Sequence, residues 1–160
     1  MIEIQLGWQG KNKGKYHALV DDEDYEWLSQ WKWYAWKAGH TRYAVRKGNT
    51  SLGEPAIVLM HRAILGLEKG DKREGDHIYG NGLDNRRSCI RAVSHQENHW
   101  NQHYHKGYGW YKPYQRWRAK IRVNGKAKHI GYYDTPEEAR AVYLAAKAVY
   151  HKIGGQPCAE

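Results

Sequence analysis

The stretch that decides the fold is residues 76–98, DHIYGNGLDNRRSCIRAVSHQEN. Asp76 and His77 stand side by side at the end of a short polar segment, and a loop rich in Gly and Asn follows them. We expect the chain to turn helical around Ala92 and to carry Asn98 on that helix. The stretch therefore predicts a strand, a tight loop and a helix that hold one divalent cation between them.

The residue types in this stretch suit metal-assisted chemistry. Asp76 and Asn98 offer hard oxygen ligands of the kind that Mg²⁺ accepts while it keeps several waters. His77 has an ordinary pKa that allows it to remove a proton near neutral pH. Mg²⁺ is the cofactor expected from this ligand set, and Mn²⁺ would also serve.

From Met60 to Asn101, about 40 residues, the chain resembles the HNH nuclease motif, the ββα-metal fold of phage and intron homing endonucleases that reads DH…N…N. The resemblance implies a metal-dependent endonuclease that hydrolyses phosphodiester bonds in DNA and leaves 5′-phosphate and 3′-hydroxyl ends. It implies that Asp76 and Asn98 bind the metal and that His77 is the general base. A phage or mobile-element gene is the origin that the resemblance suggests.

One position departs from the family pattern. The middle Asn of the motif, which in the family fixes the loop and steers the histidine, falls at Cys89, and a thiol cannot reproduce the hydrogen bonds of an amide. Asn85 and Asn81 are the alternatives that could take over this role. Because of Cys89, the alternative function is a DNA-binding protein with a weakened or inactive nuclease site.

His61 is a further candidate site residue. Family members often carry a His-Arg pair here, which implies that His61 contacts the scissile phosphate or braces the metal site. The alternative is a helix histidine whose ring bonds a backbone carbonyl. His95 precedes Asn98 by three residues and so shares a helix face with it, near the metal or on the surface.

Charge is concentrated in the last third of the chain. The net charge is +9, and residues 106–153 hold 11 Lys and Arg against three acidic residues. Such a distribution is typical of nucleic-acid binding. The chain has no Phe, and eight Trp with thirteen Tyr replace it in the expected core. An RNA-binding module is a distant third hypothesis, because the aromatic residues are placed more like core than like a stacking platform.

Residues 116–123, RWRAKIRV, alternate strictly between basic and apolar side chains. Asn124-Gly125 then supplies the two residues with positive φ that a type I′ hairpin turn requires. Counting outward from this turn places Ala127 opposite Arg122, His129 opposite Lys120 and Gly131 opposite Arg118. The pattern predicts one apolar face and one open, basic face.

A helix is expected after this hairpin, with Thr135 as N-cap, Pro136 at the first position and Glu138 in a capping box. Its apolar stripe, which extends to Ile153, would cover the sheet whose first strand is residues 108–112. This segment resembles the AP2 DNA-binding domain, in KGYGWYK and RWRAKIRVNGKAKHIGYYDTPEEARAVYLAAK. The resemblance implies DNA contact through the sheet by Arg116, Arg118, Lys120, Arg122 and His129, with Trp110 and Lys112 as candidates of unknown facing.

The N-terminal part reads as a β-rich scaffold. We expect strands at 1–8 and 16–20, a helix at 21–30, a hairpin of 31–36 and 41–46, and an apolar helix at 57–67. The interpretation as a buttress for the nuclease motif competes with a second DNA-contacting surface made of Lys32, Lys37, Arg42, Arg46 and Lys47. The expected fold class is α+β: an HNH nuclease domain at 1–105, then a three-stranded antiparallel sheet packed on one helix, AP2-like, at 106–155.

Double-stranded DNA is the expected partner. A chain with one motif has one active site, so we expect nicking by a monomer or double-strand cleavage by a DNA-induced dimer. No apolar run approaches the roughly 18 residues of a membrane span, and the N-terminus lacks a basic-then-apolar signal pattern. We therefore expect no membrane association and a cytoplasmic location, in the host cell if the gene belongs to a phage.

Overall fold

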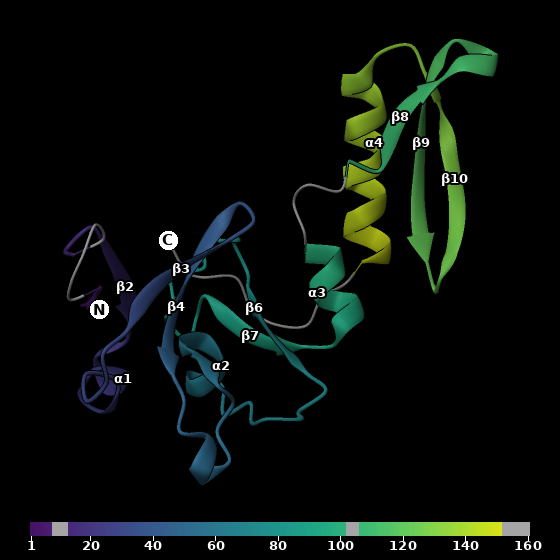
Figure 1. Ribbon diagram of the computed structural model, residues 1–160. Coiled ribbons are helices and arrows are strands. Elements are labelled where there is room, and N and C mark those ends of the chain that lie inside the picture. Colours follow the sequence, from purple (N-terminus) through teal and green to yellow (C-terminus); the bar gives the residue numbers. More distant parts are fainter. Residues whose placement is uncertain (8–12, 102–105, 152–160) are drawn as a thin grey trace. The chain divides into compact units, whose positions relative to one another are not determined.

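The computed structural model describes residues 1–7, 13–101 and 106–151 (Figure 1). The fold is mixed α+β, built from small antiparallel sheets and short helices. The described residues divide into two compact units, one before the gap at 102–105 and one after it. The domain limits expected from the sequence, 1–105 and 106–155, stay predictions.

The first unit begins with two antiparallel strands, β1 (Ile2–Leu6) and β2 (Tyr16–Val20), in which Ile4 pairs with Ala18. Helix α1 (Asp22–Leu28) follows directly. A hairpin then joins β3 (Tyr34–Ala38) to β4 (Thr41–Lys47). Its turn uses Gly39 at φ 58°, a left-handed conformation that glycine adopts at little cost.

The helix predicted at 57–67 is wrong in its first part. The short 3₁₀ turn η2 (Thr50–Leu52) leads into strand β5 (Ile57–Leu59), which pairs with β4, and helix α2 spans only Met60–Ile64. An apolar run of this length fits a strand as well as a helix, and the β-branched Ile57 and Val58 favour the strand. Pairing with β4 decides between the two, and this long-range contact is not visible in local periodicity.

The motif region forms two strands and a helix. β6 (Glu74–His77) pairs antiparallel with β7 (Ile90–Val93), with His77 opposite Ile90, and α3 (His95–Asn101) follows. The expectation that the chain turns helical around Ala92 is therefore wrong, because Ala92 lies inside β7 and the helix begins three residues later. Pairing with β6 defines this strand, and Ile90 and Val93 are buried at its two ends.

One hydrophobic core holds the first unit together. Its buried members come from β1, β2, α1, β4, β5, α2 and β7 and from the segment before β3, and they include Leu6, Val20, Leu28, Trp33 and Met60, each with no exposed surface. The Trp33 indole N–H donates to the Leu28 carbonyl at 2.8 Å, so this large ring is buried without an unpaired donor. The core supports β4 and β6, the strands that carry the candidate site.

The second unit is a three-stranded antiparallel sheet with one helix (Figure 1). The strands are β8 (Tyr108–Tyr111), β9 (Arg116–Val123) and β10 (Lys126–Tyr133), in the order β10-β9-β8. Helix α4 (Pro136–Tyr150) lies along one face of the sheet. Ala119 and Ile121 of β9 are buried beneath it together with Ala139 and Tyr143 of the helix.

The ends of these elements follow the sequence signals closely. Asn124 and Gly125 have φ of 49° and 77°, as the predicted hairpin turn requires. The Thr135 hydroxyl accepts the Glu138 N–H at 3.2 Å, which confirms the N-cap, whereas the Glu138 carboxylate reaches the Asp134 N–H and not that of Thr135. Ile153, the last member of the predicted apolar stripe, lies outside the described residues.

The predicted hairpin register is correct near the turn and wrong beyond it. Ala127 pairs with Arg122 and His129 with Lys120, as counted from the turn, but the register shifts between His129 and Gly131. This β-bulge places Gly131 opposite Ala119 and Tyr132 opposite Arg118. The residue beside Arg118 is therefore an aromatic ring and not a glycine.

Within the part of the chain that the structure describes, no helix is long and apolar enough to cross a membrane.

Candidate functional site

Strand β6 presents its motif residues on two faces. Successive side chains of a strand point to opposite sides, so Glu74 and Asp76 share one face and Gly75 and His77 the other. Asp76 and His77 are each only 6% exposed. The Asp76 carboxylate and the His77 imidazole are thus both buried, at consecutive positions of β6 and on its opposite faces.

The His77 ring meets the carboxamide of Asn85. Its Nε2 lies 3.4 Å from Asn85 Oδ1, and the Asn85 Nδ2 donates to the Leu83 carbonyl at 3.1 Å. The second bond fixes which end of the amide faces the histidine. Because Oδ1 only accepts, Nε2 must carry the proton, and Nδ1 then keeps the lone pair that a general base needs.

Asn85 is held by its backbone as well as by its side chain. Its N–H donates to the Leu19 carbonyl at 2.8 Å, and the Leu19 N–H donates to the Leu83 carbonyl at 2.9 Å, so the loop pairs with β2. Two residues further on, the Arg87 guanidinium forms bonds of 2.8 and 2.7 Å to the buried carboxylate of Asp24. The Gly/Asn-rich loop is therefore tied to the scaffold on both sides of Asn85, which has no exposed surface.

The environment of His77 favours its neutral form. Burial lowers the pKa of the His77 imidazole below its usual 6.5, while the hydrogen bond to Asn85 and the charges of Asp76 and Asp84 partly oppose this shift. A histidine with a lowered pKa is unprotonated at neutral pH. It is thus in the state required to accept a proton.

His61 of α2 packs directly against His77. Their ring centroids lie 4.6 Å apart in an edge-to-face arrangement, and the Tyr43 ring lies 5.7 Å from His61 and 5.6 Å from His77. His61 is 3% exposed, and burial lowers its pKa to about 3. Its Nδ1 has no hydrogen-bond partner among the described residues, so the expected bond to a backbone carbonyl is absent at that atom.

Gly75 is the reason that His61 can lie so close. A Cβ added at Gly75 would lie 2.3 Å from the His61 Cδ2 atom, far inside van der Waals contact. Strand β6 therefore needs a residue without a side chain at this position. The three side chains Tyr43, His61 and His77 form an aromatic cluster on this face of β6.

On the other face of β6, both carboxylate oxygens of Asp76 are engaged. Arg91 Nε donates to Oδ2 at 2.9 Å, and Asn101 Nδ2 donates to Oδ1 at 2.9 Å. The predicted ligand Asn98 lies elsewhere, because its Nδ2 donates to Glu74 Oε2 at 2.6 Å. The other oxygen of Glu74 lies 2.6 Å from His95 Nδ1. His95 therefore lies on the same face of β6 as Asp76, but it contacts Glu74.

Cys89, at the family position of the middle Asn, is buried just before β7, and its Sγ lies 3.9 Å from the Ser88 hydroxyl. Of the two alternatives for that role, Asn85 contacts His77, whereas the exposed Asn81 accepts the Leu83 N–H at 3.2 Å and closes a local turn. The amide that meets the histidine therefore comes from the middle of the loop.

The oxygen atoms around Asp76 are of the type that a hard divalent cation prefers, and one of the two carboxylate oxygens is already bonded by Arg91. Among the described residues, no group of three or more His, Cys, Asp or Glu side chains could hold a metal ion. The oxygen atoms at this place are the Asp76 carboxylate and the His77 and Ile78 carbonyls, and the carboxamides of Asn98 and Asn101 present their Nδ2 atoms to β6. Such a small set of oxygen donors suits Mg²⁺, which retains several of its waters.

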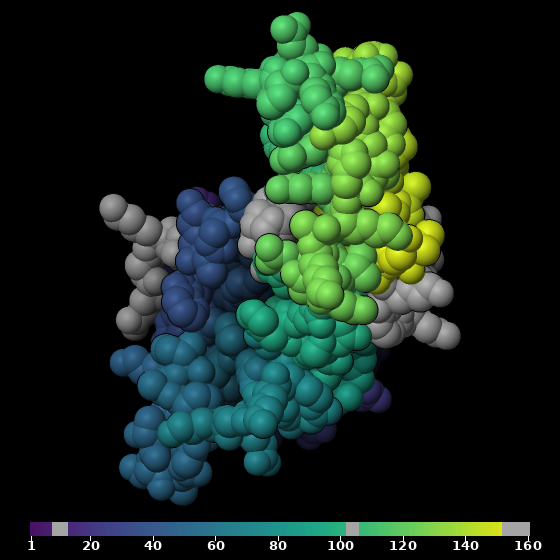
Figure 2. All heavy atoms as spheres, turned by 90° about the vertical axis from the view of Figure 1, so that its right-hand side faces the viewer, coloured from purple at the N-terminus to yellow at the C-terminus, as the bar shows by residue number. Residues whose placement is uncertain are grey.

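The open face of the sheet in the second unit carries the predicted basic residues. Arg118, Lys120, Arg122 and His129 lie on the side away from α4, and Figure 2 shows long side chains projecting from this unit. The Arg118 guanidinium lies 4.5 Å above the Tyr111 ring, and His129 lies 4.6 Å from Tyr132. The face is both basic and aromatic.

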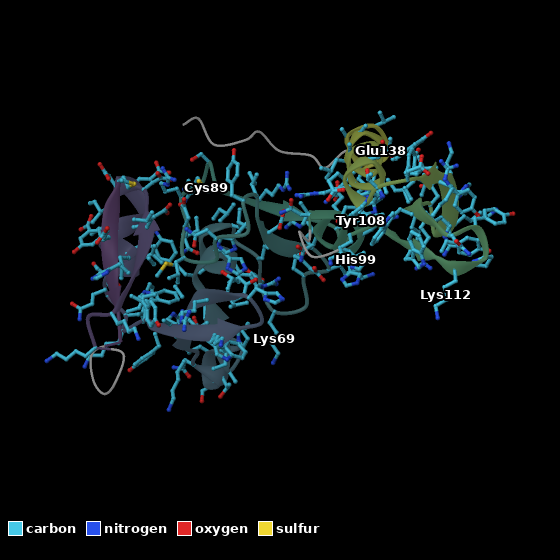
Figure 3. All side chains as sticks on the ribbon, turned by 90° about the horizontal axis from the view of Figure 1, so that it is seen from above. Lys69, Cys89, His99, Tyr108, Lys112 and Glu138 are labelled. Carbon is cyan, nitrogen blue, oxygen red and sulfur yellow. The ribbon has the colours of Figure 1, made fainter. Side chains whose placement is uncertain are left out.

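Three residues predicted to contact DNA from this face lie in different environments. Arg116 forms an ion pair with Asp134, with bonds of 2.8 and 2.6 Å. Trp110 pairs with Trp117 and so lies on the α4 side of the sheet, where half of it is exposed. Lys112 is not part of β8 but of the 3₁₀ turn η3 (Lys112–Tyr114), and its side chain points away from the sheet (Figure 3).

Arg46 is buried and so cannot belong to the second DNA-contacting surface that the sequence suggested. Arg46 is 9% exposed, because its guanidinium forms bonds of 3.0 and 2.6 Å to Glu54 and lies 4.6 Å above the Trp31 ring. Glu54 in turn has its pKa lowered to about 2 by the hydrogen bonds from Arg46. This arrangement favours the interpretation of the N-terminal part as a scaffold.

Sequence reasoning missed Tyr43, Gly75 and Asn101 in the first unit and the tyrosines 111, 114 and 132 in the second. The rings of Tyr111, Tyr114 and Tyr132 lie 4.7–5.5 Å from one another. Asn101 could have been found, since it follows Asn98 by three residues and so shares its helix face. The contact of Tyr43 depends on how β4 lies against β6, for which the sequence carries no local signal.

No protein-family model matches the sequence, and the comparisons with curated proteins and with solved structures returned no match.

Proposed function

We propose that the chain is a metal-dependent DNA endonuclease of the HNH homing type, which hydrolyses phosphodiester bonds at a recognised DNA site. The observation that carries the proposal is the buried pair of His77 and Asn85, with Nε2 3.4 Å from Oδ1 and Asp76 next along β6. The two strands β6 and β7 and the helix α3 around this pair support the proposal, because the motif resembles that of ββα-metal nucleases.

In this proposal His77 is the general base. Asn85 binds the protonated Nε2, so Nδ1 is free to take a proton from the water that attacks phosphorus. The lowered pKa keeps the imidazole neutral for this step. His61 and Tyr43 pack against the ring and restrict its rotation, so they act through His77 and not on the substrate.

Asp76 would hold the divalent cation together with an asparagine of α3, Asn98 or Asn101. Mg²⁺ is the ion that the donors favour, with Mn²⁺ as an alternative. Bound there, the ion would neutralise the charge that develops on the phosphate and on the leaving 3′ oxygen. Arg91, which pairs with the second oxygen of Asp76, would keep the carboxylate in one orientation.

The second unit would bind the DNA duplex. Arg118, Lys120, Arg122 and His129 share one open face that no acidic side chain of β8, β9 or β10 enters. Basic side chains on a sheet contact phosphates and read base edges in the major groove. This AP2-like use of the sheet would bring the nuclease site to DNA, with the chain acting as a monomer or as a dimer formed on DNA.

A DNA-binding protein without cleavage is the second candidate, and Cys89 at the family Asn position is the observation that favours it. Incubation of the purified chain with supercoiled plasmid and Mg²⁺, Mn²⁺ or EDTA separates the two. Nicked or linear plasmid with either ion and intact plasmid in EDTA supports the nuclease. Retarded but uncut plasmid under all three conditions supports the binder.

A further inference from the structure

The two asparagines of α3 face strand β6 one helical turn apart. Asn98 Nδ2 donates to Glu74 Oε2 at 2.6 Å, and Asn101 Nδ2 donates to Asp76 Oδ1 at 2.9 Å. Residues three apart on a helix share a face, and so do residues two apart on a strand. Asn98 can therefore bond Glu74 while Asn101 bonds Asp76. The position of α3 along β6 therefore makes Asn101, and not Asn98, the partner of Asp76.

Three oxygens converge on the Asn101 nitrogen. Besides Asp76 Oδ1, the carbonyl oxygens of His77 and Ile78 lie 3.0 and 3.3 Å from Nδ2. A carboxamide NH₂ has only two hydrogens, so it cannot satisfy three acceptors fully, and the His77 carbonyl also accepts the Gly80 N–H at 2.9 Å. A position lined by one carboxylate and two carbonyl oxygens has the donor chemistry that hard divalent cations prefer.

Arg91 determines from which side an ion can reach Asp76. Its Nε bonds Oδ2 at 2.9 Å, and both side chains are largely buried. The oxygen that remains for a cation is Oδ1, which is the one that faces Asn101. Asn98, by contrast, is held at Glu74, where it and His95 lower the pKa of the Glu74 carboxyl.

We propose that Asn101, and not Asn98, is the residue of α3 that joins Asp76 in holding the divalent cation. The Asn101 carboxamide would turn so that Oδ1 replaces Nδ2 at the point where the three oxygens converge. Asn98 would serve to fix α3 on β6 through Glu74. This inference rests on the proposed nuclease function and specifies its metal site.

The test compares the full-length wild type with Asn101→Ala and Asn98→Ala, which remove the same side chain one turn apart. Mn²⁺ bound by the free protein is measured by electron paramagnetic resonance, and the Mn²⁺ concentration for half-maximal plasmid nicking is measured alongside. We expect Asn101→Ala to weaken Mn²⁺ binding and nicking by roughly tenfold or more. Asn98→Ala should weaken them less, because it removes a bond that positions α3 but removes no ligand. Circular dichroism confirms that each variant is folded.

Asn101→Asp distinguishes a metal ligand from a hydrogen-bond donor. A carboxylate at this point is repelled by Asp76 and both carbonyls, so the metal-free variant should melt at a lower temperature than the wild type. If this carboxylate binds Mn²⁺, the ion removes the repulsion and stabilises the folded variant. Mn²⁺ should then raise the melting temperature of Asn101→Asp more than that of the wild type. If Mn²⁺ raises the melting temperature of Asn101→Asp no more than that of Asn101→Ala, the proposal is overturned.

The failures of the two proposals are distinguishable. A wild type that neither binds Mn²⁺ nor nicks plasmid overturns the nuclease function and this inference with it. A wild type that does both, with Mn²⁺ binding lost in Asn98→Ala and kept in Asn101→Ala, overturns only the choice of Asn101. Equal losses in the two alanine variants also overturn that choice.

Discussion

The imidazole of His77 and the carboxamide of Asn85 form a buried pair, with His77 Nε2 3.4 Å from Asn85 Oδ1. The pair joins the end of β6 to the loop that returns to β7, and the loop is itself bonded to β2 through Leu19. Because Asn85 Oδ1 only accepts, the contact selects the tautomer of His77 that has its lone pair on Nδ1. Under the proposed function, this amide eight residues after the histidine takes the role that the family pattern assigns to the position of Cys89.

Asn85→Ala should reduce plasmid nicking by roughly tenfold or more, because His77 loses the bond that fixes its tautomer and orientation. The variant should also lose about 1–3 kcal/mol of stability, since it leaves buried groups of the loop unpaired. Single-turnover nicking and urea denaturation measure the two effects. Asn81→Ala is the matched control, because it removes an exposed amide from the same loop. Equal nicking by the two variants would contradict the role of Asn85.

The pH dependence of nicking should follow His77. Since burial lowers the pKa of its imidazole below 6.5, the base stays unprotonated at a lower pH than a free histidine. The single-turnover rate should therefore rise with pH on an acidic limb whose midpoint lies below 6.5, at a saturating concentration of metal. A midpoint at or above 6.5 would show that the base is not a buried histidine.

His61 should make the fold sensitive to acid. The unfolded chain takes up a proton at this residue near pH 6.5, whereas the folded chain does so only at about 3, because burial lowers the pKa. The unfolded state binds more protons between these values, so the stability from His61 is complete above pH 6.5 and decreases as the pH falls toward 3, by about 1.4 kcal/mol per pH unit.

Urea denaturation at pH 7 and pH 4.5 tests this expectation. His61→Phe, which keeps a ring against His77, should lose less stability on acidification than the wild type. His17→Phe, which changes an exposed histidine of β2 in the same unit, should lose as much as the wild type. The same acid-induced loss in all three proteins would mean that His61 is protonated in the folded state.

How far the sequence predicts this molecule differs between its parts. Local signals were sufficient for β2, for the Asn124-Gly125 turn and for the N-cap Thr135, because each depends on residues a few positions apart. They failed for β5, which was predicted as helix, and for the bulge before Gly131, because pairing with a neighbouring strand decides both. Periodicity contains no information on such contacts.

The candidate site shows the same division. Asp76 and His77 were found from their residue types and spacing, but their partners Asn85, Asn101, His61 and Tyr43 depend on how the loop, α3, α2 and β4 meet β6. The family pattern predicts Asn98 as a metal ligand. In the structure Asn98 contacts Glu74 and not Asp76, because of the position of α3 along β6. A motif names the residues, and tertiary packing decides which of them touch.

Arg118→Ala should weaken binding to duplex DNA, because Arg118 lies on the open face of the sheet, held 4.5 Å above the Tyr111 ring. Losing one phosphate contact should reduce the slope of log affinity against log salt concentration by about 0.9. Arg140→Ala, on the exposed side of α4, removes the same charge from the unit and is the control. Fluorescence anisotropy over a salt series measures both. Equal losses would indicate that net charge alone binds the DNA.

The most direct test of the account is plasmid nicking by His77→Ala beside the wild type, at the same concentration of Mg²⁺ or Mn²⁺. Removal of the general base should lower the nicking rate by about 10²–10⁴-fold, while the affinity for DNA stays within about twofold because the proposed binding face lies in the other unit. Nicking by His77→Ala at the wild-type rate would contradict the assignment of His77 and with it the proposed nuclease site.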